Sequence, residues 1–290
     1  MSLTSMEAQS GGGRSMLNKV PEVTIYFWII KILATTVGET AADLLSMTLH
    51  LGEVWTGIIM ALVLVVVLFY QFRATRYVPG IYWLAVVLIS IVGTLLSDNL
   101  VDNLGVPLQV TTPIFSIALA ITFGAWYARE RTLSIHTIFT RRREGFYWLA
   151  VLATFALGTS GGDFLSEALR WGYFNSLLIF AGGIGLVTLA YYKLRLNAVA
   201  AFWIAYVLTR PLGASLGDLM SQTHKAGGLG LGTLWTSIVF LVTILVLVAY
   251  LAITKIDVSS GKSSLGTDAV LDALRENPTA VPVLQPVDNS

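Results

Sequence analysis

One motif occurs four times in this chain, each time inside an apolar segment: a Trp, then Gly ten residues later and Asp five residues after that. The Trp positions are separated by 55, 65 and 55 residues, which indicates a 55-residue repeat with one insertion of ten at the middle. A carboxylate inside a membrane helix costs about 2.5–3.5 kcal/mol on insertion scales, so four at equivalent positions indicate a shared role. The four sets are Trp28, Gly38 and Asp43; Trp83, Gly93 and Asp98; Trp148, Gly158 and Asp163; and Trp203, Gly213 and Asp218.

The composition places these segments in a membrane. Hydrophobic residues make up 55% of the 290 residues and charged residues only 12%, whereas soluble domains carry about 25% charged residues. The chain has no Cys, which excludes disulfides, thiolate metal sites and thiol catalysis. About 20 apolar residues span a bilayer, and eight stretches are long enough: 22–50, 54–72, 78–103, 108–128, 146–170, 173–192, 197–222 and 232–254.

The predicted fold is therefore an all-α polytopic membrane protein with eight transmembrane helices arranged as four parallel two-helix repeats, each a helical hairpin. We expect disordered ends and a cytoplasmic connector at the insertion. A short interfacial helix is one expectation for the connector, and a short amphipathic helix fits residues 269–275 of the tail. The predicted boundaries are 1–19 for the N-terminal segment, 20–75 for repeat 1, 76–129 for repeat 2, 130–144 for the connector, 145–195 for repeat 3, 196–256 for repeat 4 and 257–290 for the tail.

The basic residues predict the orientation. Fourteen Lys and Arg lie in the terminal segments and in the loops between repeats, but the turns inside the repeats hold only Arg170 and Lys225. Cytoplasmic loops carry the excess of Lys and Arg. We therefore expect a multi-pass protein of the bacterial inner membrane with both termini in the cytoplasm.

Charge also separates the odd-numbered helices from the even-numbered ones. The even helices have no Asp, Glu, Lys or Arg in their apolar cores. Ionisable groups within a membrane face a bundle interior or a water-filled cavity, so the odd helices should form an inner bundle with the even helices outside. The charged residues of the odd helices are Lys31, Glu39, Asp43, Asp98, Asp102, Asp163, Glu167, Arg210 and Asp218.

The acids of the odd helices predict a cation site. Three repeats carry a second acid four residues from the first, on the same helical face. Carboxylate and carbonyl oxygens suit Mg²⁺, Mn²⁺ or Ca²⁺. The candidate ligands are Asp43, Asp98, Asp163, Asp218, Glu39, Asp102 and Glu167, with supporting oxygens from Thr36, Thr94 and Thr159.

Two further groups of residues accompany the acids. Small residues surround each repeat glycine (Gly38, Gly93, Gly158 and Gly213), and they serve either close helix packing or local unwinding that exposes carbonyl ligands. Lys31 and Arg210 lie on the cytoplasmic side of the acids. They either form static ion pairs or act as gating counter-charges that release a carboxylate when it binds a cation or a proton.

The motif with its flanks resembles a bacterial family. Lys31–Asp43 (KILATTVGETAAD) and Tyr206–Asp218 (YVLTRPLGASLGD) are similar to segments of a family of uncharacterised, membrane-anchored proteins built from a repeat of unknown function. The resemblance covers residues 20–254. It implies the repeat architecture and a bacterial inner membrane, and it supplies no activity or ligand.

The leading functional hypothesis is a secondary-active transporter for a small cation, most simply a divalent metal such as Mn²⁺ or Mg²⁺, with proton coupling. The chain lacks a phosphate-binding loop, an HExxH motif and a nucleophile elbow. We therefore expect no enzyme activity, no resident cofactor and no nucleic-acid partner; the partners are the lipid bilayer and the cation, and a homo-oligomer is left open.

Four alternatives remain from the sequence. A permease for a small organic cation or a neutral solute would use the acids to bind an ammonium or amidinium group. A channel would prefer near-identical repeats, which Lys31 and Arg210 break. An intramembrane enzyme and a non-transporting scaffold are the others.

Overall fold

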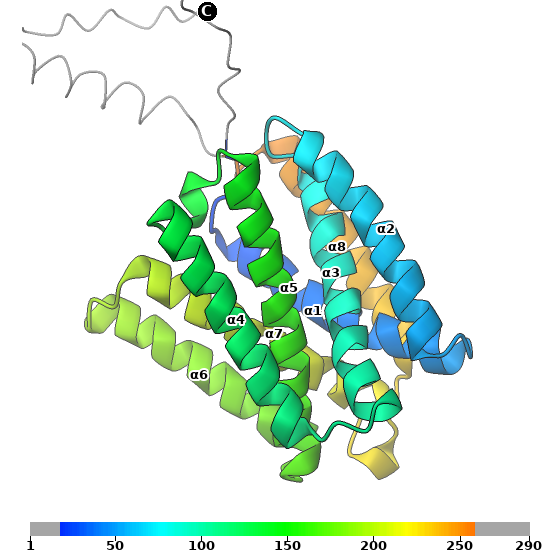
Figure 1. Ribbon diagram of the computed structural model, residues 1–290. Coiled ribbons are helices and arrows are strands. Elements are labelled where there is room, and N and C mark those ends of the chain that lie inside the picture. Colours follow the sequence, from blue (N-terminus) through cyan, green and yellow to red (C-terminus); the bar gives the residue numbers. More distant parts are fainter. Residues whose placement is uncertain (1–17, 259–290) are drawn as a thin grey trace, which may run out of the picture. The chain divides into compact units, whose positions relative to one another are not determined.

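A computed structural model describes residues 18–258, and within this range the chain folds into eight long helices and no strand (Figure 1). All eight helices are long and apolar enough to cross a membrane. The predicted all-α polytopic fold is confirmed. The predictions for residues 1–17 and 259–290, including the helix at 269–275, lie outside the described residues. The helices are α1 (Ile25–Asp43), α2 (Glu53–Arg73), α3 (Pro79–Asp98), α4 (Leu108–Glu130), α5 (Arg141–Asp163), α6 (Tyr173–Lys193), α7 (Ala198–Ser221) and α8 (Thr233–Thr254).

Side-chain caps and glycines set the helix ends. Thr24 precedes α1 and Thr140 precedes α5, and each side-chain oxygen accepts a hydrogen bond from a backbone N–H of the first helical turn. Three even helices begin directly after a glycine with positive φ, namely Gly52, Gly172 and Gly232. Only glycine adopts this conformation without a steric penalty, so these residues allow the chain to reverse direction between the two helices of a repeat.

Three of the four inner helices change geometry at the repeat Asp. The α-helical segments of α1, α3 and α5 end at Asp43, Asp98 and Asp163, and each continues as a five-residue π-helical turn. In repeat 4, α7 remains α-helical to Ser221. Single π turns inside helices are frequent at functional sites. The π turns are η2 (Leu44–Thr48), η3 (Asn99–Asn103) and η5 (Phe164–Ala168).

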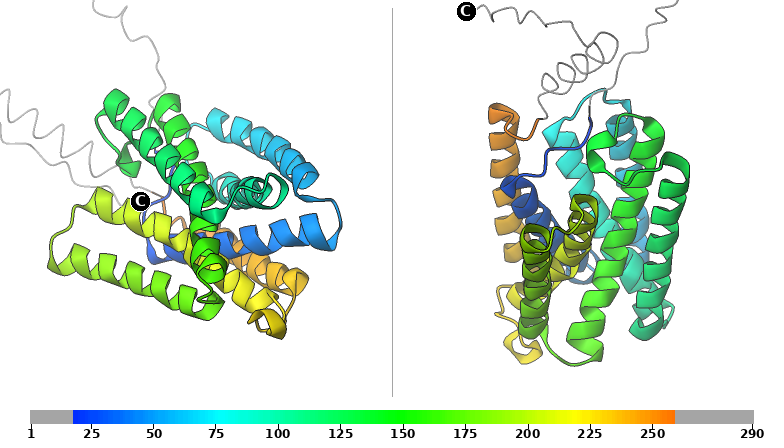
Figure 2. Two further views of the ribbon diagram at one scale, coloured as in Figure 1. Left: turned by 60° about the horizontal axis from the view of Figure 1, so that its bottom comes forward. Right: turned by 90° about the vertical axis from the view of Figure 1, so that its left-hand side faces the viewer.

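The odd helices form the inner bundle, as charge placement predicts. Between 56% and 72% of the most apolar stretch of each odd helix is buried, against 6–22% for the even helices. Helix α1 packs against α3 and α7, and α5 packs against the same two helices. The four odd helices therefore form a closed ring. Figure 2 shows these helices from two further sides.

Each even helix packs mainly against the inner helix of the following repeat. Helix α2 lies on α3, α4 on α5 and α6 on α7, and α8 closes the circle on α1 (Figure 1). The predicted two-helix repeats are present, but the two helices of one repeat are not each other's main neighbours, because the turn after each inner helix carries the chain sideways around the ring. Each repeat therefore contacts the next through its inner helix and through its outer helix.

Two groups of polar contacts join segments at the end of the bundle where the described chain begins and ends. Lys19 donates to Glu144 over 2.7 Å and to the carbonyl oxygen of Phe72, while Gln71 donates to the same carboxylate over 3.1 Å. Tyr77 donates to Asp257 over 2.6 Å. These contacts fasten the segment before α1 to α2 and α5, and the segment after α8 to the loop before α3.

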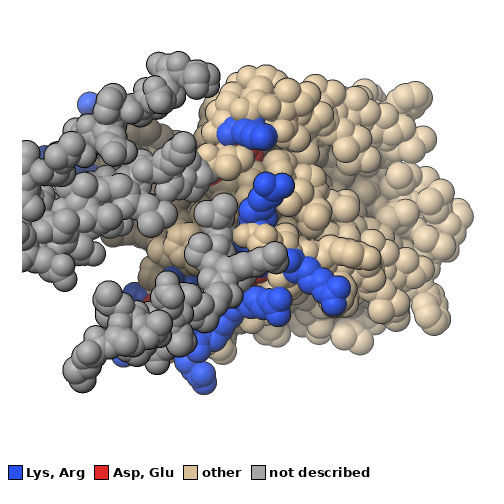
Figure 3. All heavy atoms as spheres, turned by 90° about the horizontal axis from the view of Figure 1, so that it is seen from above, with Lys and Arg blue, Asp and Glu red and all other residues tan. Residues whose placement is uncertain are grey.

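The same end of the bundle carries the basic residues of the loops between repeats. Lys and Arg side chains gather there, as Figure 3 shows. The insertion between repeats 2 and 3 contributes a single 3₁₀ turn, η4 (Ile135–Thr137), where an interfacial helix was one expectation. The carbonyl oxygen of Leu133 in this connector accepts a hydrogen bond of 2.9 Å from the indole N–H of Trp203.

Candidate functional site

The four repeat glycines join neighbouring helices of the inner ring. A side chain at Gly38 would collide with Ser90 of the next repeat, and one at Gly93 would collide with Phe155. The same relation continues around the ring: Gly158 faces Arg210, and Gly213 faces Thr35 of the first repeat.

The receiving side chains in this circle are themselves equivalent in the repeat, each three residues before a glycine. A closed cyclic order of this kind shows that the repeats surround one pseudo-fourfold axis. Helices α1, α3, α5 and α7 are continuous at the glycines, so of the two roles considered the structure shows close packing.

Three predicted ligands converge in this ring. Carboxylate oxygens of Glu39, Asp163 and Asp218 all lie within 4.8 Å of one another. Glu39 and Asp218 are buried and Asp163 is half-buried. The three acids come from α1, α5 and α7, so three separate repeats supply them. Oxygen atoms at this separation can hold a cation such as Mg²⁺ or Mn²⁺.

The other two repeat aspartates lie beside this group. Asp43 and Asp98 occupy the same repeat position as Asp163 and Asp218, and both are half-buried. Their carboxylates fall outside the 4.8 Å group. Glu39, one helical turn before Asp43, supplies the carboxylate of repeat 1 instead.

The second acids of repeats 2 and 3 do not join the cluster. Asp102 and Glu167 are exposed, and Glu167 accepts a hydrogen bond of 3.3 Å from Tyr173. The prediction placed them on the faces of Asp98 and Asp163 by α-helical spacing. Both lie within π turns, where more residues make up each turn and a four-residue step no longer returns to the same face.

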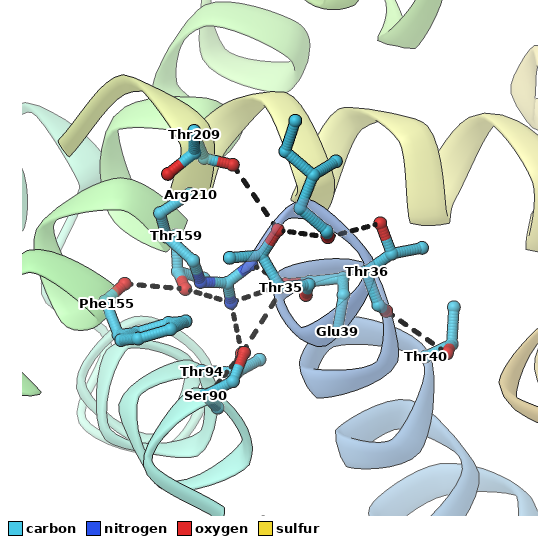
Figure 4. A network of polar contacts seen from close by, with 11 residues as sticks. Thr35, Thr36, Glu39, Thr40, Ser90, Thr94, Phe155, Thr159, Thr209 and Arg210 are labelled. Carbon is cyan, nitrogen blue, oxygen red and sulfur yellow. Dashed lines mark hydrogen bonds and ion pairs between the residues drawn. The ribbon is translucent and has the colours of Figure 1, made fainter. Parts of the chain in front are cut away.

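Arg210 occupies the middle of the ring and contacts all three of the other inner helices (Figure 4). Its guanidinium donates to Glu39 over 2.8 Å, to Thr159 over 2.6 Å and also to Thr94. A further contact of 3.4 Å reaches the carbonyl oxygen of Thr35. Arg210 is fully buried, so this ion pair is shielded from water.

The residues that receive Arg210 hold one position of the repeat, directly after the glycine. That position is Glu39, Thr94, Thr159 and Ala214 in repeats 1 to 4. Glu39 is thus shared between Arg210 on one side and the acid cluster on the other. The third predicted hydroxyl, Thr36, instead donates to the carbonyl oxygen of Ile32 over 3.1 Å, within its own helix.

Lys31 has no carboxylate partner in the described part of the chain. Its ammonium nitrogen is buried and, among residues 18–258, makes no hydrogen bond. It lies 4.0 Å from the ring centroid of Phe155 and 4.2 Å from that of Tyr206. Arg210 therefore forms an ion pair with Glu39, and Lys31 forms none with the described residues.

Sequence reasoning did not identify a layer of aromatic side chains on the side of Lys31 that faces the termini. Phe27, Tyr82, Tyr147 and Phe202 hold one repeat position, and the hydroxyls of the two tyrosines are hydrogen-bonded to each other. Applying the 55, 65 and 55 offsets to every position of the repeat, and not only to Trp, Gly and Asp, would have found this layer and the Thr35–Ser90–Phe155–Arg210 layer.

A cavity of about 690 Å³ lies away from these groups, between α1, α6, α7 and the connector. Apolar and aromatic side chains such as Trp28 and Phe202 line it, and none of the predicted ligands does. The polar chemistry of the ring is therefore separate from this cavity.

The repeat found in the sequence corresponds to a known family. The model of the family described as Repeat of Unknown Function (DUF347) matches residues 26–77, 81–132, 146–197 and 201–257. These matches cover most of the chain and all four repeats. No curated protein and no solved structure matches the chain. With four copies around one axis, the chain belongs to the family built from this repeat.

Proposed function

We propose that this protein is a secondary-active transporter of a small cation, most simply a divalent metal such as Mn²⁺ or Mg²⁺, exchanged for protons. The cation binds between Glu39, Asp163 and Asp218, with Asp43 and Asp98 as nearby acids. The observation that carries the proposal is the convergence of three carboxylates from three repeats inside a membrane-spanning ring.

The charge balance of the ring supports a cation between these acids. Like charges at this separation repel strongly in an interior of low dielectric constant. Arg210 contributes one positive charge, and among the described residues it forms its ion pair with Glu39. A divalent cation bound to the three carboxylates supplies the missing charge and replaces the water that the acids lose on burial.

Glu39 gives this arrangement two states. In the present state its carboxylate accepts from Arg210 over 2.8 Å. When a cation binds, the same carboxylate turns to the metal and Arg210 keeps Thr94 and Thr159 as acceptors. A ligand that changes the partner of one buried charge favours a different packing of the ring, which is the requirement for alternating access.

The two ends of the ring differ in how far their polar side chains are buried. Asp43, Asp98 and Asp163 are half-buried at the turn end. Toward the termini, Tyr82 and Tyr147 are fully buried. With the basic loops in the cytoplasm, this state would open toward the outside of a bacterial inner membrane.

The test is thermal unfolding of the purified full-length protein with Mn²⁺, Mg²⁺, Ca²⁺ and organic amines. A ligand that binds only the folded state stabilises it by about 2.7 kcal/mol at a hundredfold excess over its Kd. We expect a rise in Tm with one divalent metal and loss of that rise in Asp163→Asn. Asp102→Asn, an exposed acid outside the cluster, is the matched control and should keep the rise.

Two results would contradict the proposal. A rise with organic amines alone would favour the permease for an organic cation. No rise with any cation, together with a higher Tm in Asp163→Asn, would favour a scaffold in which the acids bind nothing.

A further inference from the structure

Lys31 is a buried cation of the inner ring, and the binding step leaves it unused. Its side chain is 1% exposed, and within residues 18–258 the ammonium nitrogen has no hydrogen-bond acceptor. The rings of Phe155 and Tyr206 lie on it at 4.0 and 4.2 Å. Aromatic faces attract a cation, but they do not replace the water or the carboxylate that a buried ammonium normally keeps.

Lys31 and Arg210 share one neighbour. The guanidinium carbon of Arg210 lies 5.7 Å from the centroid of the Phe155 ring, whose face also receives Lys31. The two cations therefore repel each other within the same buried layer, where the dielectric constant is low. At present the carboxylate of Glu39 partly offsets this repulsion by pairing with Arg210.

The remaining titratable groups around Lys31 are few. Its own helix carries Glu39 two turns away, and α7 carries Tyr206 and Arg210. Helices α3 and α5 present Tyr82 and Tyr147, which are hydrogen-bonded to each other. Helix α8 presents Tyr250, whose ring lies 5.5 Å from that of Tyr26 near the start of α1. The repeat aspartates lie beyond Arg210.

We propose that Lys31 carries the proton that is exchanged for the transported cation, an inference that rests on the proposed function. When a cation takes Glu39 from Arg210, the repulsion between Arg210 and Lys31 is no longer offset. Arginine does not release a proton in proteins, whereas lysine does. One N–H bond of the Lys31 ammonium breaks, the amine keeps the electron pair, and the proton leaves.

The proton leaves toward the termini. In exchange the proton leaves on the side from which the cation enters, so this step belongs to the state in which the acids open toward the termini, and Lys31 is protonated again in the state that opens toward the turns. On the terminal side lie the hydroxyls of Tyr206, Tyr147 and Tyr82, and that of Tyr206 has no partner in the described part of the chain. A hydroxyl accepts the incoming proton as it passes its own to the next oxygen, and water at the end of the bundle takes up the last one.

The experiment uses the full chain in liposomes that contain a pH-sensitive dye, with Mn²⁺ as the probe. Three rates are measured: exchange of external for internal Mn²⁺ without a pH gradient, Mn²⁺ uptake driven by a pH gradient, and proton movement reported by the dye. In wild type all three are expected. In Lys31→Met, exchange should persist while gradient-driven uptake and proton movement are lost.

Two further variants isolate the proton. Lys31→Arg keeps the positive charge but holds its proton, so it should lose the same two rates as Lys31→Met. Lys225→Met removes an exposed lysine from the turn before α8 and should behave as wild type. The Tm of each variant is measured first, and Lys31→Met should be at least as stable as wild type, because it removes a buried charge without a partner.

The outcomes separate the two proposals. Proton movement retained in Lys31→Met, or absent in a wild-type protein that exchanges Mn²⁺, would overturn the role of Lys31 and leave the transporter intact. No Mn²⁺ exchange in wild type would overturn the proposed function and this inference with it.

Discussion

Repeat 4 differs from the first three repeats in ways that concentrate on one face of α7. The first three repeats place a π turn after the repeat Asp, whereas α7 continues as an α-helix through Asp218 to Ser221. Repeat 4 also has Arg210 where the others have Thr35, Ser90 and Phe155. Its position after the glycine is Ala214, the smallest side chain of that layer.

These differences complement one another. A guanidinium on the axis needs space in its own repeat and acceptors in the others. Ala214 provides the space, and Glu39, Thr94 and Thr159 provide the acceptors. The symmetric frame therefore supplies equivalent positions around the axis, and one divergent repeat converts them into a site with a buried guanidinium that is ion-paired to Glu39. The equivalent repeats form the ring, and the divergent residues of repeat 4 form its buried ion pair.

Removing the cation of repeat 4 should have the largest effect. Arg210→Met leaves Glu39 buried beside Asp163 and Asp218 with no counter-charge. Loss of one partner of a buried ion pair typically costs about 3–5 kcal/mol. We expect a fall of this size in the free energy of unfolding, measured by denaturant titration in detergent.

The double variant Arg210→Met/Glu39→Gln removes the charges of both partners and should recover most of that loss. A single variant as stable as wild type would show that repeat 4 does not depend on its cation.

The glycine circle tests the symmetric part of the comparison. Gly213→Ala places a methyl group against Thr35 and against the backbone carbonyl oxygen of Ile32. Overpacking of this kind costs about 1–3 kcal/mol. Gly182→Ala in α6 is the control, because a methyl group there meets open space and should stabilise the helix by about 0.5–1 kcal/mol. Equal unfolding energies for the two variants would contradict close packing at the circle.

The smallest effect is expected where the end of repeat 4 meets the start of repeat 2. Burial raises the pKa of Asp257, and the hydrogen bond from Tyr77 partly offsets this rise. The protonated carboxyl is thus favoured in the folded state. Its contribution to stability is fully present below the unfolded pKa of about 3.9 and is lost as the pH rises through the folded value.

Asp257→Asn keeps an oxygen that accepts from Tyr77 but does not titrate. The Tm of wild type should therefore fall relative to that of the variant as the pH rises from about 4 to about 7, a range that starts near the unfolded pKa. Parallel Tm curves over this range would show that Asp257 does not act through its proton.

Much of the architecture follows from the sequence. The spacing of Trp, Gly and Asp predicts the repeats, and the lack of charge in the even helices predicts that they lie outside. Both properties can be predicted from sequence because they depend on a single segment or on a pattern that recurs in every repeat. The sequence also pointed to Glu39, Asp163 and Asp218 as ligands, although it placed Asp43 and Asp98 on an equal footing with them.

The positions of two further acids depended on a change of helix type that their spacing does not reveal. The sequence shows that Asp102 and Glu167 follow the repeat acids by four residues, but only the tertiary structure shows that π turns carry them to the surface. The spacing of two residues gives the angle between their side chains only along a regular α-helix, so it does not predict where they point when the helix type changes.

The sequence by itself determined eight apolar spans, a fourfold repeat and acids at one depth. The tertiary structure decided that Arg210 pairs with Glu39, that Lys31 pairs with no carboxylate of residues 18–258, and that each outer helix packs on the inner helix of the next repeat. The physical reason is that hydrophobicity and helical period act within a segment, while the partner of a buried charge is set by side chains from other repeats.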